Sequence, residues 1–251
     1  MASELPPLDT HAHIAPDVTS AQVRRLGRAV IFAVTRNLSE AASAPHGTYP
    51  SLVWGIGIHP GDRNGLGRYD PARLDRLLGR FALVGEIGLD RKAGQIDRQR
   101  EVLKDVLSRA AQAPVMMSIH SSGMASEVVD LLEAYRPRGP ILHWFGGSEA
   151  EAARAADAGA WFSVNGAMQQ ETLQYLPPDR VLTETDFPFT RKLGSSRPGA
   201  TEPAEAALAT AWGISSKEVR ERVWRNFAAL VRRTDTGDRL PRRVRGTLAL
   251  D

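Results

Sequence analysis

The chain contains no cysteine among its 251 residues. Disulfide bonds, thiolate catalysis, zinc fingers and iron–sulfur clusters are therefore excluded, and any metal ion must be held by nitrogen and oxygen donors. Long apolar runs are also missing: the longest is Ala29–Val34, far short of the ~20 residues that a helix needs to cross a bilayer. The first residues, Met1–Pro7, lack the basic flank and apolar core of a signal peptide. We therefore expect a cytoplasmic protein without membrane contact.

Charge of one sign is scarce over most of the sequence. The net charge is +3, and the segment from Arg232 to Asp251 contains six arginines and three aspartates, which is a surplus of +3 by itself. Residues 1–231 therefore sum to zero, so charge alone does not indicate nucleic-acid binding. A hydrophobic fraction of 42% excludes a disordered chain and is enough for a substantial core.

Short apolar runs that suit buried strands alternate with segments of helical periodicity. Eight strands alternating with helices in about 230 residues are typical of an α/β protein with a (β/α)8 TIM-type barrel as a single domain. An open doubly wound sheet is disfavoured because no glycine-rich phosphate fingerprint follows the first strand. Capping boxes mark helix starts at Thr19–Gln22, Ser148–Glu151 and Ser215–Glu218. The expected strands are Leu8–His11, Ala29–Thr35, Leu52–His59, Ala82–Gly88, Val115–His120, Ile141–Trp144, Trp161–Val164 and Arg180–Thr185, and the last two helices are expected at Glu202–Trp212 and Ser216–Arg233.

The barrel is expected to occupy residues 1–233. Beyond that point the sequence is polar and rich in arginine, and it contains Pro241. We therefore expect residues 234–251 to form a basic, disordered tail that folding does not require.

Histidines and carboxylates occupy the ends of most predicted strands. In a barrel the carboxyl ends of all strands converge on one face, where the active site lies. Five of the six histidines lie at or just past such an end, and His11 and His13 are two residues apart, so their imidazoles point to the same side of a strand. The candidate metal ligands are His11, His13, Glu86, His120, His143 and Asp186.

Each of these residues also has a purely structural interpretation. Two histidines can cap a strand, His120 and His143 can be satisfied core histidines, and Asp186 can cap a loop. Glu86, however, lies among apolar residues and glycines, and burying it without a cation or donors would be costly. Convergence of all six on one face favours a metal site. Six donors exceed the ~4 of a closed zinc site and allow two ions if one carboxylate bridges them, which suits phosphoester hydrolysis.

Five short motifs surround the candidate ligands: Thr10-His11-Ala12-His13, Gly57-Ile58-His59-Pro60, Gly85-Glu86-Ile87-Gly88-Leu89-Asp90, His143-Trp144-Phe145-Gly146-Gly147 and Glu184-Thr185-Asp186-Phe187-Pro188-Phe189. In order and spacing they resemble the motifs of the TatD family of metal-dependent deoxyribonucleases. The similarity extends from Asp9 to about Val231. Other segments, such as Ser118-Ile119-His120-Ser121, resemble the TatD-type component of bacterial Qat anti-phage systems.

The resemblance implies a TIM-type barrel that hydrolyses DNA with two divalent ions, of zinc, manganese or magnesium. One ion would be held by His11, His13, Glu86 and Asp186, and the other by Glu86, His120 and His143. Glu86 and Asp186 would be the catalytic carboxylates, with Asp186 as general base.

The surrounding residues are assigned more broadly by the same resemblance. His59 would contact a metal ligand or face a substrate phosphate, or it would be a structural histidine beside Pro60. Asp9 would orient a metal-bound imidazole or bind the backbone. Arg91 and Lys92 replace the aromatic residues that family members usually carry after Gly-Leu-Asp, and Asn165-Gly166 replaces a more usual pair of small or hydroxylic residues. Both changes are expected to border the substrate groove, where Arg91 and Lys92 would contact phosphates or form a solvated loop.

Two other functions remain open at this point. An amidohydrolase or lactonase acting on a small molecule would use a related barrel, but such barrels often bridge their metals with a modified lysine. Here the corresponding strand supplies Glu86, and Lys92 lies past its end. A catalytically silent scaffold in a defence complex is the third hypothesis, which an intact ligand set disfavours. The expected partners are DNA and proteins of a defence operon, with the chain as a monomer or weak oligomer.

Overall fold

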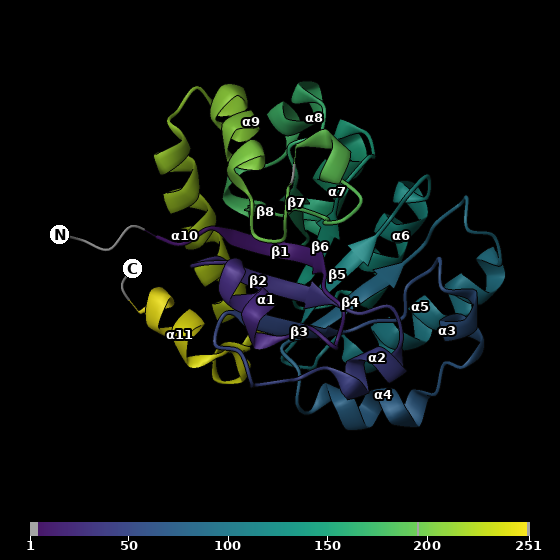
Figure 1. Cartoon of the computed structure of the whole chain (residues 1–251). Helices are drawn as coiled ribbons and strands as arrows, with labels where there is room; N and C mark the ends of the chain where they lie inside the picture. The colour runs from purple at the N-terminus through teal and green to yellow at the C-terminus, as the bar shows by residue number, and fades with distance from the viewer. Residues whose placement is uncertain (1–4, 195, 250–251) are drawn as a thin grey trace.

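The computed structural model describes residues 5–194 and 196–249. Eight parallel strands in sequential order form a nearly closed barrel, and helices lie between and around them (Figure 1). This confirms the predicted single-domain (β/α)8 fold, and each strand lies within a few residues of its predicted position. The strands are β1 (Leu8–His13), β2 (Val30–Val34), β3 (Leu52–Ile56), β4 (Leu83–Gly88), β5 (Met116–His120), β6 (Pro140–His143), β7 (Trp161–Val164) and β8 (Val181–Thr183).

The helices begin where the sequence places capping residues. The side chains of Thr19, Ser148 and Ser215 each accept a hydrogen bond from the backbone amide of the third helical residue. The side chain of that third residue in turn accepts a hydrogen bond from the backbone amide of the capping residue. The predicted capping boxes are therefore present. Within the described residues no helix combines the length and the apolarity needed to span a membrane. The helices are α1 (Ser20–Arg25), α2 (Leu38–Ser43), α3 (Arg63–Gly67), α4 (Pro71–Leu78), α5 (Ile96–Ala110), α6 (Ala125–Tyr135), α7 (Glu149–Asp157), α8 (Gln170–Tyr175), α9 (Glu202–Trp212), α10 (Ser216–Thr234) and α11 (Arg242–Leu248), with short 3-10 turns at Pro178–Arg180, Arg191–Leu193 and Gly237–Arg239.

The two ends of the strand order meet at β1 and β8. The Thr10 hydroxyl of β1 donates to the carbonyl of Thr183 in β8 at 3.0 Å. Beyond β8, the amide of Asp186 donates to the carbonyl of His11 at 2.9 Å. These bonds bring residues from opposite ends of the sequence to the same carboxyl edge of the barrel. The strands are buried along almost their whole length, as expected where helices cover a parallel sheet.

The expectation of a disordered tail is wrong for residues 234–249. Helix α11 lies on the side of the barrel where β2 and β3 begin (Figure 1). Leu240 and Val244 are buried, and the guanidinium of Arg239 donates to the carbonyls of Leu78 at 2.7 Å and Phe81 at 3.1 Å. The sequence carries the matching signal, since Leu240, Val244 and Leu248 recur every four residues, but the surrounding arginines obscure it. Residues 250–251 lie outside the described residues.

This segment should therefore contribute to stability. Burying one leucine or valine contributes roughly 1.5–3 kcal/mol, and in a protein of this size each kcal/mol changes the melting temperature by about 2–4 °C. We expect truncation after Arg233, or the double substitution Leu240→Ala and Val244→Ala, to lower the melting temperature by at least several degrees. Arg245→Ala, on the same helix, is the matched control and should change it little. An unchanged melting temperature in the double variant would show that the segment does not pack on the barrel.

Candidate metal centre

The six predicted ligands come together at the carboxyl edge of the barrel. Their side chains surround a hollow of about 530 Å³, here called the metal hollow, into which Asp90, Trp144 and Phe189 also project. His11 lies behind the others and is fully buried. The sixth histidine, His46, lies elsewhere and packs against Phe81. The ligand candidates come from five strand ends: His11 and His13 from β1, Glu86 from β4, His120 from β5, His143 from β6, and Asp186 just after β8.

The carboxylate of Glu86 is the centre of this cluster, and its two oxygens face different partners. Oε1 lies 2.8 Å from His120 Nδ1 and 3.0 Å from His143 Nε2. Oε2 lies 3.1 Å from His13 Nε2 and 3.6 Å from His11 Nε2. Each oxygen therefore faces a different set of imidazole nitrogens, as a carboxylate that bridged two ions would.

Asp186 belongs to the second of these groups. Its Oδ1 lies 3.6 Å from His11 Nε2 and 3.7 Å from His13 Nε2. The Asp186 backbone has a φ of 46°, a left-handed conformation that is uncommon for a residue with a side chain. The hydrogen bond from its amide to the carbonyl of His11 holds that conformation and directs the carboxylate toward β1.

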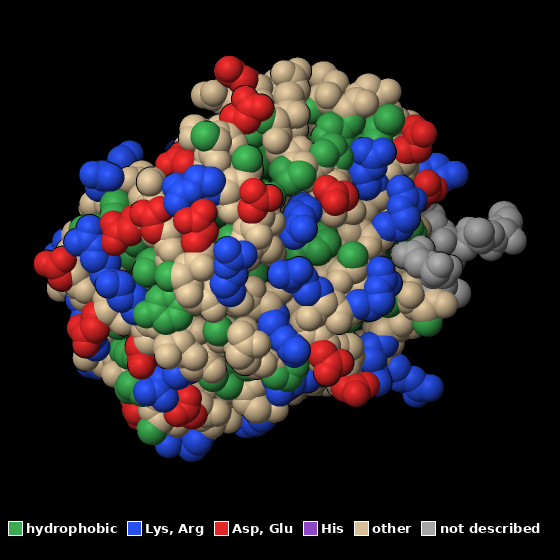
Figure 2. All heavy atoms as spheres, turned by 180° about the vertical axis from the view of Figure 1, so that it is seen from behind, with side chains coloured by type: hydrophobic (Ala, Val, Ile, Leu, Met, Phe, Trp, Pro, Cys, Tyr) green, Lys and Arg blue, Asp and Glu red, His purple; other side chains and the backbone are tan. Residues whose placement is uncertain are grey.

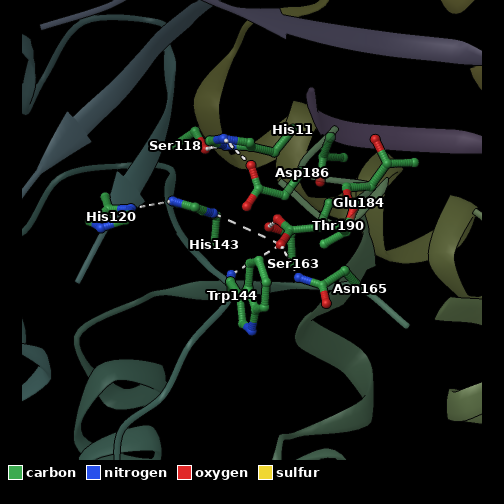
Figure 3. A network of polar contacts seen from close by, with 12 residues as sticks. His11, Ser118, His120, His143, Trp144, Ser163, Asn165, Glu184, Asp186 and Thr190 are labelled. Carbon is green, nitrogen blue, oxygen red and sulfur yellow. Dashed lines mark hydrogen bonds and ion pairs between the residues drawn. The ribbon is translucent and has the colours of Figure 1, made fainter. Parts of the chain in front are cut away.

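The far nitrogens of three imidazoles face polar groups that orient the rings. Nδ1 of His11 lies 2.7 Å from the hydroxyl of Ser118 (Figure 3). Nε2 of His120 lies 3.3 Å from Asp90, and Nδ1 of His143 lies 3.9 Å from Glu184. Only Ser118 is hydrogen-bonded to its histidine, and a bond of this kind sets which nitrogen is protonated and which has a lone pair for a metal ion.

His59 differs from the other histidines in its hydrogen bonding. Its Nδ1 accepts a hydrogen bond from the amide of Gly61 at 2.8 Å, so in the neutral ring the proton is on Nε2. That nitrogen lies 3.2 Å from Glu86 Oε2. Although His13, His59 and Glu86 are close enough to share an ion, this bonding favours His59 as an outer group.

Charge in the cluster is strongly coupled. Burial by itself would raise the pKa of Glu86, but the neighbouring charge of His143 and hydrogen bonds from the other histidines hold it well below its usual range. Burial would lower the pKa of His143, but the Glu86 and Glu184 carboxylates hold it well above its usual range. Burial, together with the charge of His143, lowers the pKa of His11 to about 4, so that ring is neutral and available as a ligand.

Asp186 is the carboxylate that holds a proton most readily. Burial raises its pKa to about 8, with further contributions from the negative charges of Glu184 and Glu86, against the opposing charge of His143. A carboxyl group with this pKa can exchange a proton near neutral pH, as a general base must.

Several buried polar atoms of the cluster have no hydrogen-bond partner among the described residues. They include Nε2 of His11, Oε2 of Glu86 and Oδ1 of Asp186. All three face the same space between β1, β4 and β8. A divalent ion bound in that space would be the partner that these buried atoms lack. The donor set of imidazoles and carboxylates suits zinc or manganese and also accepts magnesium. The residues present therefore fit a metal site.

Two residues of the site were not assigned from the sequence. Glu184 is fully buried, accepts hydrogen bonds from Asn165 at 3.0 Å and from the Trp144 amide at 3.2 Å, and is also bonded by Ser163 (Figure 3). Asp90 faces His120. Both occur at strand ends within quoted motifs, so the same signal that identified Asp186 was available for them. Asn165 is itself buried behind the site. It was expected to border the substrate groove, and its burial contradicts that expectation.

Asp9 bonds to the backbone, which is the second of its two predicted roles. It accepts hydrogen bonds from the amides of Thr185 and Gly199, both at 2.8 Å, and from the Thr185 hydroxyl at 2.7 Å. Burial raises its pKa to about 7 despite these bonds. Asp9 thus holds the segment after β8 against β1.

The two basic candidates separate in the structure. Arg91 lines a second hollow of about 630 Å³, which shares Gly123 and Gly146 with the metal hollow. Lys92 is exposed and lines neither hollow.

A (β/α)8 barrel with histidines and carboxylates gathered at its carboxyl edge is the architecture of a metal-dependent hydrolase. The sequence agrees with this class, because residues 8–232 match the family described as TatD related DNase. The chain belongs to that family.

Individual relatives agree with this assignment. The chain is 29% identical to a 3'-5' ssDNA/RNA exonuclease TatD of Edwardsiella piscicida, over 72% of this chain and 76% of the relative. It is 27% identical to YabD of Bacillus subtilis, an uncharacterized metal-dependent hydrolase, over 72% of this chain and 80% of the relative. The crystal structure of YJJV, a TatD homolog of Escherichia coli K12, superposes with a TM-score of 0.73 at 23% identity, over 89% and 96% of the two chains, and shares the fold.

Metal binding should depend steeply on pH. In the metal-free chain the pKa of Asp186 is about 8, so below that pH a proton must leave before Asp186 can bind an ion. Metal affinity should therefore fall about tenfold or more per pH unit as the pH is lowered from about 8 to 6. Isothermal titration calorimetry in buffers of different ionisation enthalpy would count the protons released. Asp186→Asn should give a profile shallower by about one proton, whereas a flat wild-type profile would contradict the assignment of Asp186 as a ligand.

Substitution of Asp9 should reduce stability without removing metal. Asp9→Asn places an amide N–H₂ where an oxygen now accepts from Gly199, and an unpaired buried donor costs about 1–3 kcal/mol. Urea unfolding would measure this loss, and the folded variant should retain wild-type metal stoichiometry. Asp90→Asn is the matched control, because Asp90 faces His120 and should affect metal affinity more than stability. Loss of metal from folded Asp9→Asn would favour the imidazole-orienting role instead.

Proposed function

We propose that this chain is a nuclease that hydrolyses phosphodiester bonds of DNA with two divalent ions held in the metal hollow. The proposal rests on the two carboxylate oxygens of Glu86, which face different histidines. Oε1 faces His120 and His143, while Oε2 faces His11 and His13. Two ions bridged in this way would stabilise charge on both the attacking and the leaving oxygen of a phosphodiester. The exonuclease relatives named TatD support nucleic acid as the substrate.

The residues of the chain then have distinct tasks. Glu86 would be shared by the two ion positions, one completed by His11, His13 and Asp186 and the other by His120 and His143. Asp186 would accept the proton of the attacking water, because its carboxylate lies beside the first position, with Oδ1 3.6 Å from His11 Nε2. His59, whose Nε2 lies 3.2 Å from Glu86 Oε2, would help to position that carboxylate from outside the ion positions.

A strand could leave the metal hollow through the second hollow. The two hollows share Gly123 and Gly146, so a chain can pass from one to the other beneath Arg91. Two of the three acidic residues there are paired with arginines, Glu127 with Arg100 at 2.5 Å and Asp130 with Arg154 at 2.7 Å, while Glu151 accepts hydrogen bonds from Ser148. Arg91 makes no recorded ion pair in the described part of the chain, and its Nε donates to the Gly123 carbonyl at 2.8 Å. We therefore assign Arg91, and not Lys92, to phosphate contact.

The small-molecule alternative has less support from the site. No lysine lines the metal hollow, so a lysine-bridged pair of ions is not available there. The proposed role in bacterial anti-phage defence, with partner proteins of that system, rests on the sequence resemblance alone.

The two carboxylates allow metal binding and chemistry to be separated. Glu86→Ala should lower the metal content at both positions and abolish nuclease activity, since each position loses a charged ligand. Asp186→Asn should retain an ion at Glu86, His120 and His143 and still bind DNA, while the rate falls by about 10²–10⁴-fold for want of a base. Metal analysis and cleavage of a single-stranded oligonucleotide with Mn²⁺ or chelator would measure these effects.

His46→Asn is the matched control, because this histidine lies outside the cluster and should leave both readouts unchanged. A lactone assayed in parallel tests the alternative enzyme class. Hydrolysis of the lactone without cleavage of DNA would overturn the proposal, and so would wild-type cleavage by Asp186→Asn with its full metal content.

A further inference from the structure

Phe189 is exposed to solvent directly beside the metal centre. Its side chain is 60% exposed, and it is the one large apolar residue recorded as exposed in residues 5–194 and 196–249. It lines the metal hollow, and its ring meets the ring of His13 edge to face, with centroids 5.3 Å apart at an interplanar angle of 79°. A single exposed apolar residue is ordinary on a protein surface, but this one lies against a candidate metal ligand.

Hydrogen bonds hold the backbone that carries the Phe189 ring. The amide of Phe189 donates to the carbonyl of Asp186 at 2.9 Å, which closes a tight turn. The next residue, Thr190, is buried and its hydroxyl donates to the carbonyl of Thr185. The turn that carries Asp186 therefore also places the aromatic side chain at the rim of the hollow.

A second aromatic residue, Trp144, lines the same hollow. Its backbone has a φ of 40°, a conformation that bulky residues rarely adopt. The Trp144 amide holds that conformation by donating to the carbonyl of Ser163 and to Glu184, both at 3.2 Å. The hollow thus combines aromatic surface with metal-ligating groups, and neither lysine nor arginine lines it.

We propose that Phe189 is a stacking platform for a nucleobase, which it positions beside the phosphate held at the metal centre. The proposal rests on the function proposed above and adds a base-binding subsite to it. A planar aromatic ring binds any base through its π-face, so such a subsite is tolerant of sequence. Because neither lysine nor arginine lines the hollow and its histidines surround Glu86, a base rather than a further phosphate is the group that the exposed Phe189 surface suits.

The test compares three variants of Phe189. Phe189→Ala removes the ring, Phe189→Leu keeps apolar bulk without a π-face, and Phe189→Trp keeps a larger one. On a single-stranded oligonucleotide, the alanine variant should lose about 5- to 100-fold in kcat/KM, as expected for one lost base stack. The leucine variant should recover only part of this loss, and the tryptophan variant nearly all of it. Metal content and melting temperature should remain those of the wild type.

The substrate provides the second half of the test. One abasic residue is moved along the oligonucleotide. At one position, it should slow the wild-type enzyme by a factor similar to that of Phe189→Ala, while slowing the alanine variant little further. Binding of a fluorescently labelled oligonucleotide, measured by anisotropy in an Asp186→Asn background, should weaken in the same pattern. These readouts report on the base and not on the metal.

Two outcomes would overturn the inference. Phe189→Ala could process every oligonucleotide like the wild type, in which case the ring serves another purpose, such as contact with a partner. Alternatively, it could lose activity equally on intact and abasic substrates, which would mean that Phe189 acts through His13. If the metal-loaded wild type cleaves no DNA at all, the proposed nuclease function fails first, and this result is distinct from both.

Discussion

The structure depends on one buried negative charge. Glu86 is 1% exposed, and an unpaired carboxylate at that depth would be too costly to tolerate. Its charge is offset by imidazole nitrogens from β1, β5 and β6 and from the loop after β3, so four separate parts of the barrel wall must converge on it. The fold and the site therefore depend on each other. The barrel supplies the convergence that the charge requires, and the charge fixes the direction in which the converging side chains point.

The same logic explains the seam between β1 and β8. The site needs His11 and Asp186 together, although 175 positions separate them in the numbering. Backbone bonds between the two segments do part of this work, and the buried Asp9 adds three bonds to the residues after β8. Asp9 is thus a carboxylate of the site that serves geometry and not ligation. The turn from Asp186 to Thr190, which directly follows the Thr185 bonded by Asp9, carries both the Asp186 carboxyl group and the exposed ring of Phe189.

The sequence predicted the parts of this arrangement that follow from periodicity and strand ends. Alternating patterns give the barrel, and the barrel's shared carboxyl edge gives the convergence of His11, Glu86 and Asp186. Residues that act on other residues were harder to assign, because Glu184 and Asp90 carry no signal of their own beyond position. Only the folded chain shows that each faces the outer nitrogen of a ligand histidine. The prediction for the C-terminal segment was wrong for a different reason. Three apolar residues spaced by four are a weak helical signal when arginines surround them, and tertiary contacts decide whether such a segment packs on the barrel.

The distribution of charge bears on how such a site would hold a polyanion. On the face drawn in Figure 2, Lys and Arg side chains alternate with Asp and Glu, and no broad basic surface is present there. Binding by counterion release across many phosphates would need such a surface. In the proposed function, affinity would come from the metal hollow itself, through ions that neutralise one phosphate and through the aromatic surface of Phe189 that contacts one base. Recognition of only one or two nucleotides would suit an enzyme that acts on flexible single strands, because their bases are free to enter a hollow. It would suit an enzyme that binds a duplex along its length less well.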